Sequence, residues 1–210
     1  MGKIEITKKV LGICATNCYT VVDTETKEAL IIDPADRADV LIRDWKDKGV
    51  TPTAVLLTHG HFDHIGALAG VKKEYPEIRV YAAAEEKEVM ESPALNLSSS
   101  FGAAFTAQAD IYLEDGAEIE VLGRKCKCLL VPGHTKGGMC YYFPEENVVF
   151  TGDTLFCYSV GRTDFPTGDA KALEDAIREK LFLLPDETLV LPGHDAQTMI
   201  GKEKTGNPYF

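Results

Sequence analysis

The strongest constraint in the sequence is a short run of metal-ligand side chains at the end of an apolar segment. Segment 58–64 reads Thr-His-Gly-His-Phe-Asp-His and directly follows the apolar run 55–57. Since the chain has five histidines in 210 residues, a window of six holds about 0.14 histidine by chance, against three here. Four such side chains on one strand-end loop cannot all face one point, but they can face two adjacent points. The run therefore predicts a metal site with room for two neighbouring ions.

The two remaining histidines occupy similar positions elsewhere in the chain. His134 and His194 each follow an apolar run and a Pro-Gly turn, and Asp153 comes shortly after the apolar run 148–150. Glycine beside each of these positions lets the backbone turn sharply or pass close to a ligand. Because ordinary loop residues would not place all five histidines at strand ends, we interpret them as one metal site. Imidazole and carboxylate ligands without a thiolate suit zinc, iron or manganese.

Short apolar runs bounded by glycine, proline and aspartate dominate the chain, and they predict strands. The predicted strands cover 4–10, 18–22, 29–32, 54–57, 79–81, 117–121, 126–131, 139–143, 148–150 and 188–191. Apolar residues at helical spacing predict helices over 37–48, 65–75, 84–91 and 169–180, the last with Asp169 as its N-cap. Segment 92–110 lacks periodicity and predicts a long loop or short helical turns, which form either a lid or a surface excursion. This order predicts two β-rich layers flanked by helices.

The composition limits the functions that are open to the chain. The formal net charge is −11 and the isoelectric point is about 4.9, which disfavours binding to nucleic acid or to an anionic membrane surface. No apolar run has the length that a membrane span needs, and the first residues carry no secretory signal, so we expect a cytoplasmic protein. The six cysteines are scattered, and we expect reduced and mostly buried thiols.

Taken together, these residues resemble the complete ligand pattern of the metallo-β-lactamase superfamily over essentially the whole chain. The resemblance implies an α+β fold, a four-layer αββα sandwich, formed by residues 1–210 as a single domain. It also implies two divalent metal ions at one edge of the two sheets, with zinc expected and iron or manganese as alternatives. By position, one ion would be held by His59, His61 and His134, and the other by Asp63, His64 and His194. Asp153 and a water or hydroxide would bridge them.

The resemblance also implies a reaction. Two metal ions lower the pKa of a water that they share, so the bridging hydroxide would be the nucleophile at neutral pH. Asp63 and Asp153 would tune that water and are the expected catalytic residues. Segments 151–156 and 161–165 and the ending 192–210 are similar to glyoxalase II and its short relatives, the hydroxyacylglutathione hydrolase-like enzymes. The expected partner is therefore a small anionic thioester, with no nucleic acid and no membrane.

Two departures from glyoxalase II leave the substrate open. That enzyme carries an added C-terminal helical domain that helps to bind glutathione, whereas 16 residues follow His194 here, so we expect no such domain. The tyrosine found two residues after the last histidine in that family is Ala196 in this chain. Arg162 stands where that family has a basic substrate contact, and Tyr158 and Lys136 are further candidate substrate contacts. The alternatives are a salt-bridged loop arginine at 162 and a buried aromatic at 158.

Other functions stay open at this point. A persulfide dioxygenase would share segment 161–165 but would bind one iron through His59, His134 and Asp153. A lactonase or another metallo-hydrolase of the same fold is a further alternative. A metal-binding fold retained only for interaction is disfavoured because the ligand set is intact. The acyl group, the thiol carrier, the native metal and the oligomeric state are not determined by the sequence.

Overall fold

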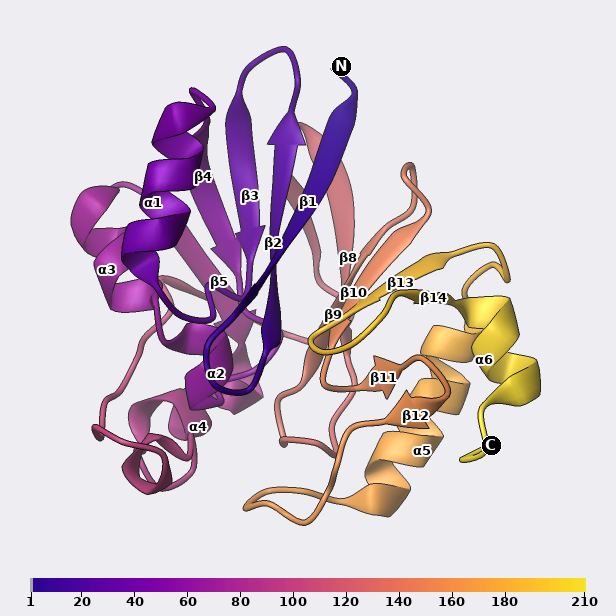
Figure 1. The fold of residues 1–210 in the computed structure, drawn as a ribbon. Coiled ribbons are helices and arrows are strands. Elements are labelled where there is room, and N and C mark those ends of the chain that lie inside the picture. Colours follow the sequence, from indigo (N-terminus) through magenta and orange to yellow (C-terminus); the bar gives the residue numbers. More distant parts are fainter. Residues whose placement is uncertain (1) are drawn as a thin grey trace.

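The computed structural model describes residues 2–210, and two six-stranded sheets form its centre (Figure 1). The first sheet has the strand order β1-β2-β3-β4-β5-β6, and the second has the order β14-β13-β10-β9-β8-β7. The strands of the first sheet are β1 (Ile4–Leu11), β2 (Thr16–Asp23), β3 (Glu28–Ile32), β4 (Thr51–Leu56), β5 (Arg79–Ala83) and β6 (Ile111–Leu113). Those of the second are β7 (Glu118–Val121), β8 (Arg124–Leu130), β9 (Met139–Phe143), β10 (Val148–Gly152), β13 (Leu189–Pro192) and β14 (Thr198–Met199). A separate hairpin pairs β11 (Leu155–Phe156) with β12 (Ser159–Val160).

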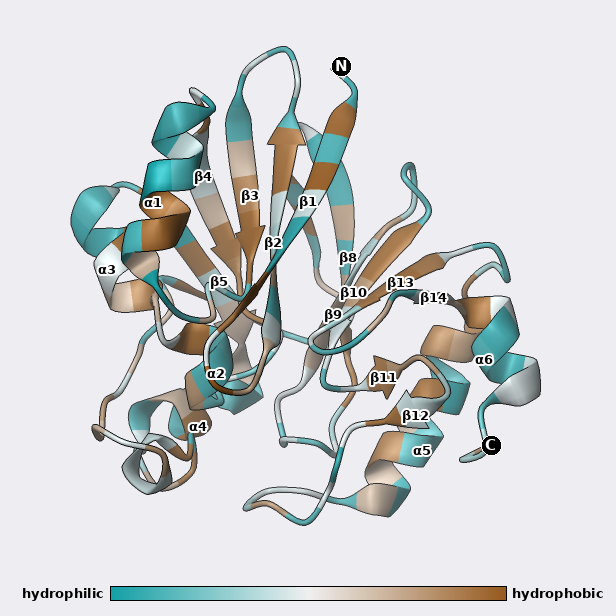
Figure 2. Cartoon of the chain, in the orientation of Figure 1, coloured by the Kyte–Doolittle hydropathy of each residue, from teal (hydrophilic) through white to brown (hydrophobic). Residues whose placement is uncertain are grey.

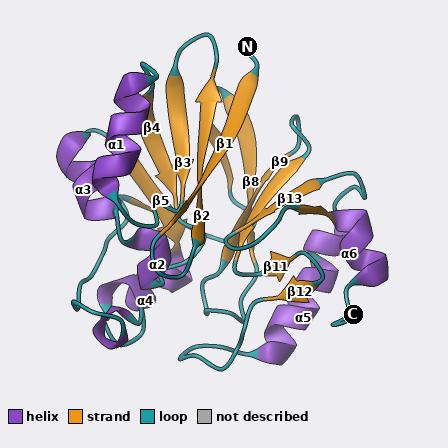
Figure 3. Ribbon diagram, in the orientation of Figure 1, coloured by secondary structure: helices purple, strands orange, loops and turns teal. Residues whose placement is uncertain are grey.

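Helices cover the outer face of each sheet (Figure 3). The α-helices are α1 (Ala38–Asp47), α2 (Phe62–Ile65), α3 (Leu68–Glu74), α4 (Lys87–Glu91), α5 (Ala170–Glu179) and α6 (Ile200–Gly206). Short 3₁₀ turns are η1 (Ala84–Glu86), η2 (Ser98–Ser100) and η3 (Leu181–Leu183). Helices α1 and α3 pack on the first sheet, while α5 and α6 pack on the second. The predicted four-layer αββα sandwich is therefore confirmed.

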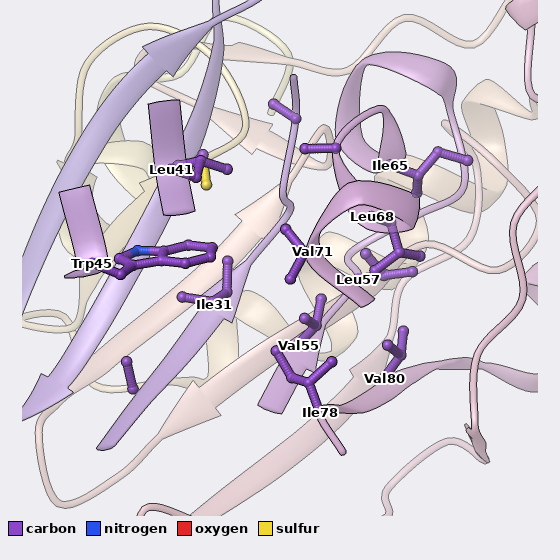
Figure 4. Packing of buried hydrophobic residues seen from close by; sticks show 14 of the residues in the cluster. Ile31, Leu41, Trp45, Val55, Leu57, Ile65, Leu68, Val71, Ile78 and Val80 are labelled. Atoms are coloured by element: carbon purple, nitrogen blue, oxygen red, sulfur yellow. The ribbon is translucent and has the colours of Figure 1, made fainter. Parts of the chain in front are cut away.

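Three apolar clusters hold the four layers together. In the cluster under α1 and α3, Trp45 and Leu41 of α1 meet Ile31 of β3, and Val71 of α3 completes the contact (Figure 4). A second cluster fills the space between the two sheets, and a third lies under α5. The exposed face of α1 is hydrophilic, as an amphipathic helix on a sheet requires (Figure 2).

The strand directions explain why the site lies at one edge. β10 is parallel to β13, and β9 runs antiparallel to both β8 and β10. The carboxyl ends of β8, β10 and β13 therefore point the same way, as do those of β3 and β4 in the first sheet. Hydrogen bonds join the two sheets at this edge, from Met139 N–H to the carbonyl of Thr58 (2.8 Å) and from Asn17 N–H to the carbonyl of Gly193 (2.7 Å).

All ten predicted strands are present, and the N-cap of α5 is also confirmed, since Asp169 Oδ1 accepts a hydrogen bond from Ala172 N–H at 3.0 Å. The prediction of one continuous helix over 65–75 is wrong, because α2 ends before Gly66 and α3 begins at Leu68. The N–H of Ala67 donates to the carbonyl of Pro34 (2.9 Å) and so leaves the helical pattern. A contact from a distant loop breaks this helix.

Several elements were not predicted from the sequence: β6, β11, β12, β14, α6 and the short 3₁₀ turn η3. Helix α6 contains two glycines, which lower its intrinsic propensity. The fully buried carboxylate of Glu203 accepts hydrogen bonds from Thr198 Oγ1 (2.5 Å) and Asn207 Nδ2 (2.9 Å), and so ties both ends of α6 to their neighbours.

The predicted loop 92–110 contains η2 and lies against the histidine segment. The N–H of Phe62 donates to the carbonyl of Asn96 at 2.8 Å, and the rings of Phe62 and Phe101 stack with centroids 4.7 Å apart. Within residues 2–210, no helix is both long and apolar enough to cross a membrane.

Candidate metal centre

The structure brings all seven predicted metal ligands together at the edge where the strands end. They come from four segments that follow β4, β8, β10 and β13, and two of them, Asp63 and His64, lie on the short helix α2. Three overlapping groups have their ligand atoms within 4.8 Å of one another. These groups are His59, His61 and His134; His59, His64 and Asp153; and Asp63, His64 and His194.

The first group, which we call the histidine trio, consists of His59, His61 and His134. His61 Nδ1 lies 3.1 Å from His59 Nε2 and 3.0 Å from His134 Nε2. Burial and the neighbouring imidazoles lower the pKa of His61 to about 3 and that of His59 well below its usual value. A single nitrogen of a neutral imidazole either donates or accepts, so His61 Nδ1 cannot form good hydrogen bonds with both neighbouring nitrogens. Three nitrogens that converge in this way fit the ligand shell of a cation bound at about 2.0–2.1 Å.

Backbone and hydroxyl groups orient the trio. The His134 Nδ1 atom lies 2.7 Å from the carbonyl oxygen of Arg162, and a carbonyl only accepts, so the proton is on Nδ1. The Nε2 atom of His134 is therefore left with its lone pair toward the other two rings. Thr58 Oγ1 lies 3.2 Å from His59 Nδ1. This is the arrangement in which a polar neighbour fixes the tautomer of a metal-binding histidine.

The second group, which we call the acidic trio, consists of Asp63, His64 and His194. Asp63 Oδ2 lies 3.6 Å from His64 Nε2 and 3.4 Å from His194 Nε2, and it accepts a hydrogen bond from Thr16 Oγ1 at 2.7 Å. Burial lowers the pKa of His194, but its contacts with Asp153 and Asp63 outweigh burial and raise it to about 9. Without metal this group is held together by charge, and a cation would replace the protons.

Asp153 lies between the two trios. Its Oδ2 atom is 3.6 Å from His134 Nε2 of the histidine trio and 3.3 Å from His194 Nε2 of the acidic trio. Its Oδ1 atom and His64 Nε2, 3.4 Å apart, are both buried and have no hydrogen-bond partner in the described part of the chain. Buried polar atoms without partners are costly, and a bound cation would satisfy both. The donor set therefore fits one metal ion in each trio with Asp153 in contact with both.

Asp33 is a site residue that is not among the ligands predicted from the sequence. Its buried carboxylate accepts hydrogen bonds from Thr58 N–H (2.8 Å) and Thr58 Oγ1 (2.7 Å), and its Oδ2 lies 2.8 Å from His64 Nδ1. A carboxylate that receives the Nδ1 proton leaves the His64 Nε2 lone pair toward the acidic trio. The sequence signal is only an aspartate between an apolar run and a proline.

The three predicted substrate contacts lie outside the cluster of metal ligands. Arg162 is an exposed residue whose guanidinium contacts both oxygens of Asp164 at 2.7 Å and lies over the ring of Phe165, 4.0 Å from its centroid. Lys136 forms an ion pair with Glu88.

Tyr158 is 52% exposed, so the alternative of a buried aromatic is wrong, and its ring lies beside Gly206 at the end of α6. Arg162 is linked to the site through Phe165. Its guanidinium lies over the Phe165 ring, and that ring meets the His61 ring edge-on with centroids 5.8 Å apart.

Comparison with known proteins decides the family. The family model of the metallo-beta-lactamase superfamily matches residues 11–194. The chain belongs to the metallo-beta-lactamase superfamily. Membership implies binding of divalent metal, and the chain is a metallo-hydrolase of this superfamily.

Two curated relatives match along almost their whole length. A probable metallo-hydrolase of Bacillus subtilis, YqgX, is 37% identical over 202 residues, which cover 95% of this chain and 94% of the relative. Hydroxyacylglutathione hydrolase GloC of Haemophilus influenzae is 35% identical over 200 residues, 92% of each chain.

Three solved structures share the fold and between 32% and 39% of the aligned residues. BLEG-1, described as a B3 metallo-beta-lactamase, has a TM-score of 0.92 and 39% identity, with 98% of this chain and 99% of that chain covered. TTHA1623 in a di-iron-bound form has a TM-score of 0.85 and 36% identity, with 97% and 100% covered. ETHE1 from Myxococcus xanthus has a TM-score of 0.80 and 32% identity, with 97% and 83% covered.

Proposed function

We propose that this chain hydrolyses a thioester, with hydroxyacyl-glutathione-like molecules as the substrate class. The observation that carries the proposal is the pair of adjacent ligand trios with Asp153 between them. The similarity to GloC, named a hydroxyacylglutathione hydrolase, supports the choice of a thioester.

In this proposal each ligand group has a defined role. The histidine trio would hold one metal ion, the acidic trio would hold the other, and Asp153 would contact both. Two bound divalent ions would supply a hydroxide at neutral pH and would polarise the substrate carbonyl. Thr16, Asp33 and the Arg162 carbonyl orient Asp63, His64 and His134, so the ligand atoms are held in place before the substrate arrives.

The open side of the cluster favours an anionic substrate. The side chains of His194, Asp153 and Asp63 are 20%, 12% and 13% exposed, whereas His64 is fully buried, so a substrate would approach past the first three. Two divalent ions bring four positive charges, of which the two aspartates offset two, so the loaded site is cationic in an acidic chain. Arg162 also lines a neighbouring cavity of about 390 Å³, where it would contact the acidic part of the thiol carrier.

Zinc is the metal that we propose. Iron is the first alternative to test, because the similar protein TTHA1623 has been solved in a di-iron-bound form. A cytoplasmic location is part of the same proposal, because all six cysteines are free thiols, four of them buried, as expected in a reducing compartment.

The test is metal analysis of the purified protein beside a panel of thioesters, lactones and β-lactams. We expect two metal equivalents and turnover of thioesters above all other classes. Asp63→Ala should lose one metal equivalent and most of the activity while keeping the fold, whereas Asp186→Ala, which removes an exposed ion pair with Lys204, should change neither. Undiminished hydrolysis in an Asp63→Ala protein that has lost one metal equivalent would refute the dinuclear mechanism, and retention of both equivalents would refute the assignment of Asp63 as a metal ligand.

A persulfide dioxygenase is the second candidate, because ETHE1 is similar along this whole chain and Asp153 Oδ2 lies near His134 Nε2. That activity would use one iron held by His59, His134 and Asp153. One iron per chain with rapid oxygen uptake on glutathione persulfide, and no thioester turnover, would replace the hydrolase proposal.

A further inference from the structure

Glu86 is a fully buried carboxylate on an element that carries no metal ligand. It ends the turn η1, just after β5, and its side chain has no exposed surface. Its Oε1 accepts a hydrogen bond from Gly60 N–H at 2.8 Å. Its Oε2 accepts from Thr135 Oγ1 at 2.9 Å and from Gly137 N–H at 2.9 Å. Burial of a carboxylate is costly, and three donors compensate for it here.

The three donors belong to the two loops that carry the histidine trio. Gly60 lies between His59 and His61, and Thr135 directly follows His134. Those loops leave different sheets, since one follows β4 and the other follows β8. One carboxylate therefore joins the two halves of the trio across the sandwich.

The approach of both loops to Glu86 depends on glycine. A Cβ atom at Gly60 would lie 3.3 Å from Glu86 Oε1 and 2.7 Å from Met90 Cγ. A Cβ atom at Gly137 would lie 2.5 Å from Glu86 Oε2 and 2.4 Å from the Glu86 backbone nitrogen. At Gly137 the clash with the Glu86 backbone excludes any side chain, whereas at Gly60 a side chain would displace that of Met90 and crowd the carboxylate.

We propose that Glu86 is a positioning residue that sets the spacing between the His59–His61 loop and the His134 loop, and thereby the metal affinity of the histidine trio. The inference rests on the proposed function in so far as the trio holds a metal ion. Loss of one acceptor releases one loop, and small displacements of ligand atoms weaken metal binding by about 10- to 100-fold. The acidic trio does not contact Glu86, so its affinity should not change.

The variant Glu86→Gln makes the smallest change that tests this role. It keeps the shape of the side chain but replaces one acceptor oxygen with an NH₂ group, so that at least one backbone N–H, of Gly60 or of Gly137, loses its partner. Glu91→Gln is the matched control, because Glu91 lies on the adjacent helix α4 and, within residues 2–210, its carboxylate accepts a side-chain hydrogen bond only from Gln108.

The two metal positions are separated by measuring the variants in an Asp63→Ala background, which leaves the histidine trio as the intact site. Metal-free protein is titrated with Co²⁺, with visible absorption and calorimetry as readouts, and its unfolding temperature is recorded. We expect Glu86→Gln/Asp63→Ala to bind Co²⁺ at least about 10-fold more weakly than Asp63→Ala. Glu91→Gln/Asp63→Ala should match Asp63→Ala.

The outcomes separate this inference from the proposed function. If Asp63→Ala alone binds no Co²⁺, the proposed dinuclear site fails. If Asp63→Ala binds one equivalent and Glu86→Gln leaves the dissociation constant unchanged, Glu86 is only structural and the inference is overturned. Should Glu86→Gln not fold, Thr135→Val removes a single donor, and an unchanged dissociation constant in that variant would overturn the inference equally.

Discussion

Replacement of Asp33 by asparagine tests whether a buried acceptor controls the tautomer of a metal ligand. Asp33 Oδ2 faces two donors, Thr58 Oγ1 at 2.7 Å and His64 Nδ1 at 2.8 Å, while Oδ1 accepts from Thr58 N–H. In Asp33→Asn the carbonyl oxygen keeps the bond to Thr58 N–H and the NH₂ group faces His64. Two donors then meet, so the proton of His64 moves from Nδ1 to Nε2.

The relocated proton lies on His64 Nε2 and blocks the lone pair with which this nitrogen would bind the metal ion. His64 Nε2 lies 3.4 Å from Asp153 Oδ1 and 3.6 Å from Asp63 Oδ2, so the new N–H finds carboxylate acceptors and is stabilised in the metal-free protein. Loss of such an orienting partner weakens metal binding by about 10- to 100-fold, which is about 1.4–2.7 kcal/mol. The reverse orientation of the amide leaves the buried Thr58 N–H unpaired at a cost of about 1–3 kcal/mol.

The assay is a Zn²⁺ titration of metal-free Asp33→Asn with thermal unfolding recorded in parallel. We expect the equivalent bound by the acidic trio to weaken at least about 10-fold, and more than the equivalent bound by the histidine trio, because Asp33 contacts His64 directly but reaches His59 only through the hydroxyl of Thr58. Asp36→Asn, at an exposed position three residues away, is the control and should match the parent protein. Two unchanged dissociation constants in Asp33→Asn would show that this carboxylate does not set the His64 tautomer.

Three further predictions concern stability. Asp169→Ala removes the hydrogen bond to Ala172 N–H that caps α5, and chemical denaturation should show a loss of about 1 kcal/mol; no change would mean that solvent caps the helix equally well. Tyr19→Phe removes the 2.8 Å bond from the buried hydroxyl to the Pro192 carbonyl, which keeps its bond from Asn17 Nδ2 (2.9 Å), and the same measurement should show a loss of about 0.5–1.5 kcal/mol. In metal-free protein the pKa of His194 is raised from 6.5 to about 9, so its stabilising charge is fully present below pH 6.5 and is lost as the pH rises through 9. The melting temperature of metal-free protein should therefore fall between pH 7 and pH 9.5, and a flat profile would contradict this assignment.

Local sequence determined most strands and most helices, because periodic apolar residues and capping groups act within one element. The N-cap at Asp169 is such a case, since the donor lies three residues away. The break between α2 and α3 was not predictable, because it depends on the carbonyl of Pro34 reaching the N–H of Ala67 from a separate loop. Helix α6 escaped prediction for a similar reason, as Glu203 is buried by contacts that its local sequence does not show.

The sequence by itself determined which side chains stand at the strand ends and therefore which ligand chemistry the site offers. Only the tertiary structure decided how they pair, because His61 and His134 are 73 positions apart in the chain and lie 3.0 Å apart in space. It also decided which ring nitrogen faces inward, through Asp33 and through the carbonyl of Arg162. These partners act through single hydrogen bonds between distant segments, and such bonds leave no periodicity or spacing in the sequence by which they could be recognised.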